Sequence, residues 1–238
     1  MKTIEKLSDQ RISALTAGTS LIVMALAAFF AYGFIHGRLV VQDNPALTFQ
    51  NILASVNLFK AELLGWIIIL ICDVIAAWAL YIVLAPIHKG LSLLGAWLRL
   101  IYSAMLGVAI LNLVFVLLLS KNIPYLSSFN ANQIQALMML SLEAFQSIWS
   151  IGLIIFGGHL LVVGYLALRS RNIPRIIGIL LLLGGIGYIS INLCNIFLPG
   201  YSKLISTLTL IFTLPMTLGE LGLAIWLLFK NPARESVS

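Results

Sequence analysis

The stretch AELLGWIIILICDVIAAWALYIVL, residues 61–84, decides the fold, because it is almost entirely apolar and its only charged side chains are Glu62 and Asp73. A helix needs roughly 20 mostly apolar residues to cross a hydrocarbon core about 30 Å thick. Residues 12–34, 91–119, 148–168, 176–198 and 204–229 have the same character. Backbone groups in lipid must pair within the protein, and the alternation typical of a membrane barrel is missing. The chain is therefore predicted to be all-α, a bundle of six transmembrane helices.

The composition agrees with this class and excludes a soluble domain. Of the 238 residues, 61% are hydrophobic and 9% are charged, and the mean hydropathy is +1.07. These values are typical of an integral membrane protein whose partner is the lipid bilayer. The net charge of +6 needs no nucleic acid to explain it, because membrane orientation and contact with anionic headgroups account for it.

The distribution of Lys and Arg orients the bundle, since cytoplasmic loops carry the excess of positive charge. With a cytoplasmic N-terminus, nine of these residues lie inside (Lys2, Lys6, Arg11, Lys89, Arg169, Arg171, Arg175, Lys230, Arg234) and four lie outside (Arg38, Lys60, Lys121, Lys203). Both termini are therefore predicted to be cytoplasmic. The first apolar stretch is too long for the core of a signal peptide, so we expect a retained helix.

Two longer outer connections are predicted to form amphipathic helical segments within one membrane domain, residues 1–238. Asn44 and Pro45 make a helix start, with a capping Asn and Pro at the first helical position. The second segment is predicted to begin near Ser128 or Asn130 and to continue into the fourth span. Both segments are expected to lie along the outer interface or over the mouth of the bundle.

Four ionisable side chains lie inside the predicted helices: Asp73, Arg99, His159 and Glu220. At about 1.5 Å per residue, they lie roughly 13–18 Å from the cytoplasmic helix ends, in one layer. Placing an Asp or Arg at a helix centre costs about 2.5–3.5 kcal/mol. We therefore expect the four side chains to face the interior and to pair with one another.

The charges of this layer do not cancel. Asp73 and Glu220 supply two negative charges and Arg99 one positive charge, which leaves −1 if His159 is neutral. Because burial penalises net charge, the layer is expected to hold one extra proton, on His159 or on a carboxylate, or to bind a cation. Arg99 is expected to anchor one acid, while His159 and the other acid share the titrating proton. The alternative is a purely structural layer that fixes helix packing.

Further polar side chains near this layer form a second candidate set: Glu62, Asn112, Tyr188, Asn192, Asn195 and Thr213. Glu62 shares one helical stripe with Asp73, and Pro215 is expected to kink the last helix beside the layer. Two interpretations stay open. The set either lines a polar cavity that opens outward, with Glu62 near its mouth, or supplies hydrogen bonds between helices.

Small and aromatic residues predict how the helices pack and where they are anchored. Glycines cluster in the fourth span (Gly152, Gly157, Gly158, Gly164) and in the fifth (Gly178, Gly184, Gly185, Gly187). They are expected to let these two helices approach closely. Trp66 and Trp149 are expected to anchor their helices at the headgroups.

The sequence contains neither H-E-x-x-H nor G-x-S-x-G, nor a Cys/His metal spacing. His36 and His88 are predicted near opposite faces, far from His159, so neither a three-His metal site nor a bis-His haem is expected. Cys72 and Cys194 are expected to be unpaired apolar residues. No metal or cofactor is predicted, and an enzyme is the less favoured interpretation.

The stretch FGGHLLVVGY at residues 156–165, followed by Arg169-Ser170 and by IPRIIG at 173–178, resembles an uncharacterised, mainly bacterial family of six-span membrane proteins, the domain of unknown function 4386. GIGY at 185–188 and GELGLAIW at 219–226, with Glu62 and Arg99, are similar to the same family. The resemblance covers about residues 10–230. It implies a multi-pass protein of a prokaryotic plasma membrane, and it implies no settled activity, substrate or cofactor.

Three functions follow from these features. The first is binding or translocation of a small polar solute or a proton through the layer of Asp73, Arg99, His159 and Glu220. The second is a non-transporting membrane subunit, regulator or lipid-interacting protein, in which the layer only fixes packing. The third is an intramembrane enzyme. Neither an oligomeric state nor a pathway is predicted.

Overall fold

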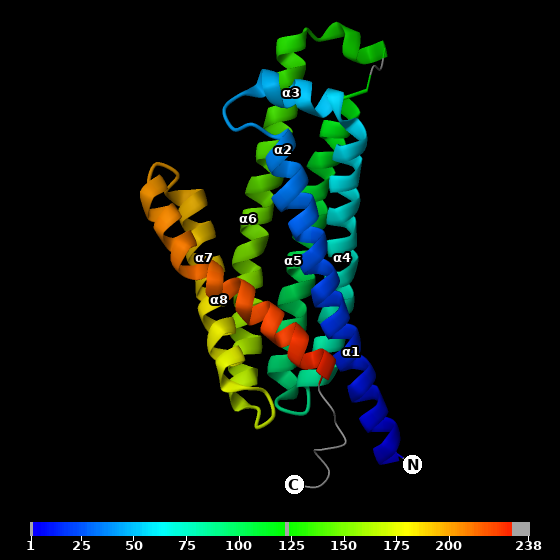
Figure 1. Ribbon diagram of the computed structural model, residues 1–238, viewed down its shortest axis with the longest axis vertical. Helices are drawn as coiled ribbons and strands as arrows, with labels where there is room; N and C mark the ends of the chain where they lie inside the picture. Colours follow the sequence, from blue (N-terminus) through cyan, green and yellow to red (C-terminus); the bar gives the residue numbers. More distant parts are fainter. Residues whose placement is uncertain (1, 122–123, 230–238) are drawn as a thin grey trace. The chain divides into compact units, whose positions relative to one another are not determined.

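The computed structural model describes residues 2–121 and 124–229, and these residues form helices joined by short connections, with no strand among them (Figure 1). The elements in chain order are α1 (Lys2–Ala28), the π-helix η1 (Phe29–His36), α2 (Gly37–Leu39), α3 (Pro45–Ala54), α4 (Val56–Leu84), α5 (Lys89–Leu119), the 3-10 helix η2 (Pro124–Ser128), α6 (Ala131–Arg169), α7 (Arg175–Phe197) and α8 (Ser202–Phe229).

The six predicted spans are confirmed. The stretches long and apolar enough to cross a membrane are Asp9–Leu39, Val56–Leu84, Lys89–Leu119, Ala131–Arg169, Arg175–Phe197 and Ser202–Phe229. At nearly every end, the helix reaches or passes the boundary expected from hydropathy, because polar residues continue the helix beyond its apolar part. The chain is an all-α, multi-pass membrane protein, and the cytoplasmic position of its termini stays a prediction.

Both helix starts predicted in the longer connections are confirmed, and each has a side-chain cap. Asn44 Oδ1 accepts a hydrogen bond from the Leu47 backbone N–H at 3.0 Å, and Pro45 is the first residue of α3. Asn130 and Gln133 form a reciprocal capping box, with both backbone-to-side-chain bonds at 2.9 Å. From this box α6 continues without interruption through the fourth span to Arg169.

The chain divides into two compact units. The first consists of Met1–Val23, Ile71–Ser103 and Ser150–Ser238, and the second of Met24–Leu70 and Ala104–Trp149. The helices α1, α4, α5 and α6 each contribute one part to each unit. All four residues of the predicted charged layer belong to the first unit, whereas Glu62 belongs to the second.

Glycines bring α6 and α7 together in the first unit, as predicted. A Cβ on Gly157 would lie 2.7 Å from the Gly185 carbonyl oxygen, and a Cβ on Gly164 would lie 2.9 Å from that of Gly178. Backbones at this separation admit no side chain between them. The α6–α7 contact therefore depends on these four glycines.

The remaining glycines of α7 serve a different contact. An added Cβ on Gly184 would lie 3.2 Å from Met216 Cα, and one on Gly187 would lie 2.6 Å from Phe212 Cβ. Both neighbours belong to α8, which lies beside α7 (Figure 1). The helix α7 therefore presents one small-residue face to α6 and another to α8.

We predict that Gly185→Ala lowers the free energy of unfolding by about 1–3 kcal/mol. The new methyl group would lie 2.7 Å from the Gly157 carbonyl oxygen, which is backbone and cannot rotate away. The matched control is Gly37→Ala, at a helical glycine with no atom within 4 Å of the added Cβ; it is expected to gain up to about 1 kcal/mol. Unfolding in mixed detergent micelles measures both variants, and equal stability of the two would contradict the proposed contact.

Candidate functional site: a buried Asp–Arg–His chain and a Glu–Tyr pair

Three of the four predicted layer residues meet inside the first unit, where each is 1% exposed. Asp73 from α4 places Oδ1 2.7 Å from Nη2 of Arg99, which comes from α5. Arg99 Nη1 lies 3.1 Å from Nε2 of His159, which comes from α6. The other ring nitrogen, Nδ1, lies 2.8 Å from the carbonyl oxygen of Gly95. A continuous polar chain therefore joins three helices.

The two contacts of His159 determine its protonation. A guanidinium only donates hydrogen bonds, so Nε2 has to accept from Arg99. A backbone carbonyl only accepts, so Nδ1 has to carry the proton that it donates to Gly95. Both conditions hold only for the neutral imidazole with its proton on Nδ1. The expectation that His159 shares the titrating proton is inconsistent with this geometry, because the nitrogen that would take the proton faces a cation.

The predicted anchoring of one acid by Arg99 takes the form of an ion pair with Asp73 through one carboxylate oxygen. Oδ1 lies close to Nη2, so the guanidinium and the carboxylate attract each other directly. In a buried site, two opposite charges at 2.7 Å attract each other strongly, and removal of either one leaves the other buried and uncompensated.

Glu220 forms a separate pair. It lies on α8, is only partly buried, and its Oε1 accepts a hydrogen bond from the Tyr188 hydroxyl at 3.0 Å. The Phe156 ring connects this pair with the buried chain: Arg99 Cζ lies 5.3 Å from the ring centroid, and the Tyr188 ring meets it edge-on at 5.2 Å. Of the four predicted layer residues, three are therefore in direct contact, and Glu220 is separated from them by the Phe156 ring.

The electrostatic surroundings of Glu220 involve charges on other helices. Arg99 and Asp73 are the charged groups that act on it, alongside the phenol of Tyr188. Arg99 also faces the Asp73 carboxylate at 2.7 Å, so two carboxylates share one cation.

The second candidate set does not form one polar interior. Asn192 donates to the Tyr188 carbonyl, Asn112 to the carbonyls of Val108 and Ala109, and Thr213 to that of Thr209. Each of these bonds runs back to the same helix, so the expected interhelical hydrogen bonds are not made by these donors. Side chains of this kind satisfy their own polar groups locally within apolar surroundings.

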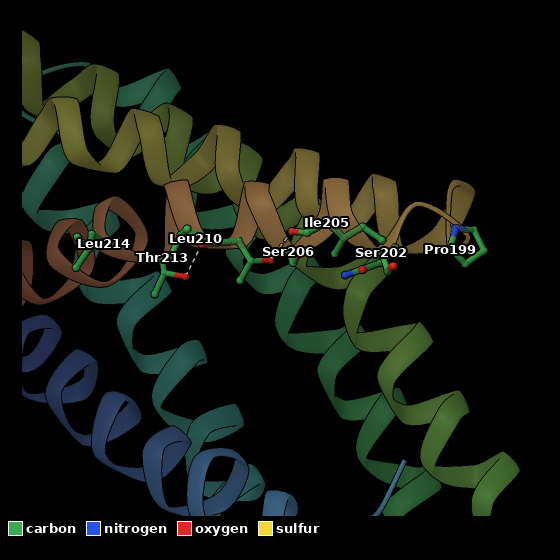
Figure 2. A pocket seen from close by; sticks show the side chains of 9 residues that line it. Pro199, Ser202, Ile205, Ser206, Leu210, Thr213 and Leu214 are labelled. Atoms are coloured by element: carbon green, nitrogen blue, oxygen red, sulfur yellow. Dashed lines mark hydrogen bonds between the residues drawn. The ribbon is translucent and has the colours of Figure 1, made fainter. Parts of the chain in front are cut away.

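A groove of about 780 Å³ lies where α7 ends and α8 begins (Figure 2). It is lined by Asn195, Pro199, Ser202, Ile205, Ser206, Thr209, Leu210, Thr213 and Leu214. Two of the predicted polar residues, Asn195 and Thr213, lie in this wall. Leu210 and Leu214 are 80% and 66% exposed, so the groove is open along its side rather than an enclosed polar cavity.

Glu62 lies in the second unit with a partner that the sequence analysis did not assign to it. His36 Nδ1 is 2.7 Å from Glu62 Oε1, and Trp66 and Trp149 pack beside the pair at 4.9 Å between ring centroids. Trp66 is 1% exposed, so its predicted role as a headgroup anchor is wrong. The available signal was the i, i+4 spacing of Glu62 and Trp66, which places a carboxylate and an indole on one helical face.

Both cysteines are free. Within residues 2–121 and 124–229, no three His, Cys, Asp or Glu side chains are grouped so that they could hold a metal ion.

Comparison with known proteins identifies the family. The family model described as "Domain of unknown function (DUF4386)" matches residues 16–231. An uncharacterized protein from Archaeoglobus fulgidus is 29% identical over 170 residues, which are 71% of this chain and 83% of that protein. No solved structure matches the chain. Because the match extends over most of the six spans and includes the buried chain and Glu220, this protein belongs to the DUF4386 family.

Proposed function

We propose that the protein binds and transfers protons within the membrane, with Glu220 as the exchanging acid and Tyr188 as its hydrogen-bond partner. The observation that supports this proposal is the position of His159 between Arg99 and Gly95. It keeps the imidazole neutral. Asp73 and Glu220 then carry two negative charges against the single positive charge of Arg99, so one negative charge is left over.

A leftover carboxylate inside a membrane is unstable unless it takes up a proton. Moving a carboxylate from water into an apolar interior costs several kcal/mol, and protonation removes that cost. Glu220 has a neutral phenol as its hydrogen-bond partner and is less buried than Asp73, Arg99 or His159. It is therefore the group that can exchange a proton with its surroundings while the buried chain keeps its charges.

A proton is a better ligand for this site than a small polar solute. Asp73, Arg99 and His159 are each 1% exposed, which leaves a solute no access to their polar atoms. A proton needs only a chain of hydrogen bonds. Exposed apolar side chains on every span, such as Leu26, Trp78, Leu111, Leu140, Ile186 and Leu210, support contact with lipid. We place both termini in the cytoplasm on the charge distribution of the loops. The prokaryotic plasma membrane is what the family resemblance implies.

The burial of Asp73, Arg99 and His159 also favours a second function. A chain of three residues that is closed to water also suits a non-transporting membrane subunit, in which Asp73, Arg99 and His159 only fix the packing of α4, α5 and α6. In that case Glu220 can be neutralised without functional consequence. The two functions therefore differ in what they predict for Glu220 and not in what they predict for the buried chain.

The test is proton movement in lipid vesicles that contain the purified protein and a pH-sensitive dye. We expect wild-type vesicles to dissipate an imposed pH gradient faster than protein-free vesicles, and Glu220→Gln to return the rate to the protein-free value. This substitution keeps the size of the side chain and removes the exchangeable proton. The control is Glu143→Gln, at an exposed glutamate of the same type on α6, which is expected to behave as wild type.

Two results would refute the proposal. One is a wild-type rate equal to that of protein-free vesicles, and the other is an unchanged rate in Glu220→Gln. Tyr188→Phe provides a graded comparison, because it removes only the hydroxyl that donates to Glu220. It is expected to lower the rate without abolishing it, since the carboxyl group that holds the proton remains.

A further inference from the structure

Three helices of the second unit each contribute an i, i+4 pair to one cluster. The pairs are Tyr32 and His36 from η1, Glu62 and Trp66 from α4, and Phe145 and Trp149 from α6. Neighbouring rings of different pairs have centroids between 4.9 and 6.4 Å apart. Most of these contacts are edge-on, the arrangement that aromatic rings prefer. The cluster surrounds a carboxylate with apolar surfaces.

The carboxylate is completely buried, whereas its partner is not. The Glu62 side chain is 0% exposed and that of His36 is 16% exposed, and Nδ1 lies 2.7 Å from Oε1. His36 therefore separates Glu62 from the medium at the end of the first span that is farther from the N-terminus. Any proton that reaches Glu62 by this route has to pass through the imidazole.

Two polar atoms of the cluster have no partner among the described residues: Glu62 Oε2 and Trp66 Nε1. The first accepts hydrogen bonds and the second donates them, and both belong to side chains one turn apart on α4. Buried polar atoms are nearly always satisfied, by protein or by ordered water. A single small molecule that both accepts and donates would satisfy the two atoms, and water is the smallest such molecule.

We propose that His36, Glu62 and Trp66 form a second proton-binding site, in which Glu62 takes up a proton through His36 and one bound water joins Glu62 Oε2 to Trp66 Nε1. The site is independent of the function proposed for Glu220, since it uses other residues in the other unit. The Tyr32 phenol of η1, which is hydrogen-bonded to Gln146 of α6, also interacts with Glu62.

The proton balance of this site is simple. A neutral His36 with its proton on Nδ1 donates to Glu62 Oε1. A proton arriving at Nε2 from the medium makes the imidazolium, and the Nδ1 proton then passes to Oε1. The products are a neutral imidazole with its proton on Nε2 and a neutral carboxylic acid, so one proton has entered and the charge of the pair has changed from −1 to 0.

The local backbone explains why these groups meet. A π-helix has one more residue per hydrogen-bonded ring than an α-helix, and such segments are rare and frequent at functional sites. In η1 it places Tyr32 and His36 in a stack 5.2 Å apart. Gly65 then lets α4 approach η1 closely, because a Cβ at this position would lie 2.8 Å from Ala31 Cβ. The approach brings Glu62 within reach of His36.

The test is infrared difference spectroscopy on the full chain in phosphatidylcholine vesicles, recorded after a step in pH. In wild-type protein labelled with ¹³C-glutamate, we expect a labelled carbonyl band of a protonated carboxyl group that is lost in Glu62→Gln and retained in Glu143→Gln. A band that depends on Glu220 belongs to the other proposal and is removed only by Glu220→Gln. The two proposals therefore fail separately.

Two further variants test the route and the water. His36→Gln is expected to slow the appearance of the Glu62 band on the order of a hundredfold, whereas His88→Gln, at an exposed histidine, leaves it unchanged. Trp66→Phe keeps a ring and removes the N–H, so it is expected to shift the frequency of the band. Retention of every glutamate band in Glu62→Gln overturns the site. If that variant does not fold, absence of a labelled carboxyl band in Glu220→Gln, where Glu62 is intact, overturns it.

Discussion

Arg99→Gln is expected to lower the free energy of unfolding by roughly 3–5 kcal/mol. Arg99 is 1% exposed, and it lies between the Asp73 carboxylate at 2.7 Å and the His159 ring nitrogen at 3.1 Å. Its removal leaves Asp73 charged and buried without a cation, and leaves His159 Nε2 without a donor. The measurement is unfolding in mixed detergent micelles against a matched control, Arg175→Gln, at an exposed arginine that begins α7.

The double variant Asp73→Asn with Arg99→Gln distinguishes two costs. One is the cost of leaving a single charge buried without its partner, and the other is the loss of the attraction between the two charges. Asn and Gln are neutral, so no charge is left buried, and part of the stability is expected to return relative to Arg99→Gln alone. Such a non-additive result identifies the residues as one energetic unit. If the two single changes simply add, the residues are not coupled, and the ion pair is not what holds α4 to α5 in the first unit.

The spans and the helix starts were predictable because they depend on local chemistry. Residues 61–84 are apolar over a length that only a membrane requires. The Asn44 side chain caps α3 by accepting a hydrogen bond from the backbone N–H three residues later, and that spacing is visible in the sequence. The cost of charge in lipid also predicted that Asp73, Arg99 and His159 would pair.

The division of the charged layer was not predictable, because it depends on the rotation of helices about their axes and on one intervening ring. Phe156 and His159 are one helical turn apart on α6, and their rings stack at 5.6 Å. The Phe156 ring also meets Arg99 and Tyr188, so it lies between the buried chain and the Tyr188–Glu220 pair. Equal depth in the membrane, which the sequence gives, does not distinguish contact from separation by a ring.

The pairing of His36 with Glu62 was missed for a different reason. Apolar periodicity predicts an α-helix throughout the first span, whereas η1 is a π-helix and changes the direction in which Tyr32 and His36 point. The burial of Trp66 was also not predicted, because an aromatic residue near a predicted helix end is usually an interfacial anchor. Gly65 was the one local sign of close packing beside it.

His159→Phe is expected to lower the free energy of unfolding by roughly 2–4 kcal/mol, the sum of one lost hydrogen bond to a charged group and one to a carbonyl. Phenylalanine keeps a ring beside Phe156, so the loss reports on the nitrogens rather than on packing. His88→Phe, at an exposed histidine whose ring nitrogen accepts from Leu91 N–H, is the control and is expected to cost no more than about 1 kcal/mol.

The same residue provides a test of charge that does not depend on stability. Nitrogen-15 spectra of labelled histidine are expected to show His159 as the neutral form with its proton on Nδ1, both at neutral pH and after moderate acidification, because Nε2 accepts from the Arg99 guanidinium. A His159 imidazolium at neutral pH would place the extra proton of the layer on this ring. Glu220 would then need no proton of its own, and the reason for assigning proton exchange to it would be lost.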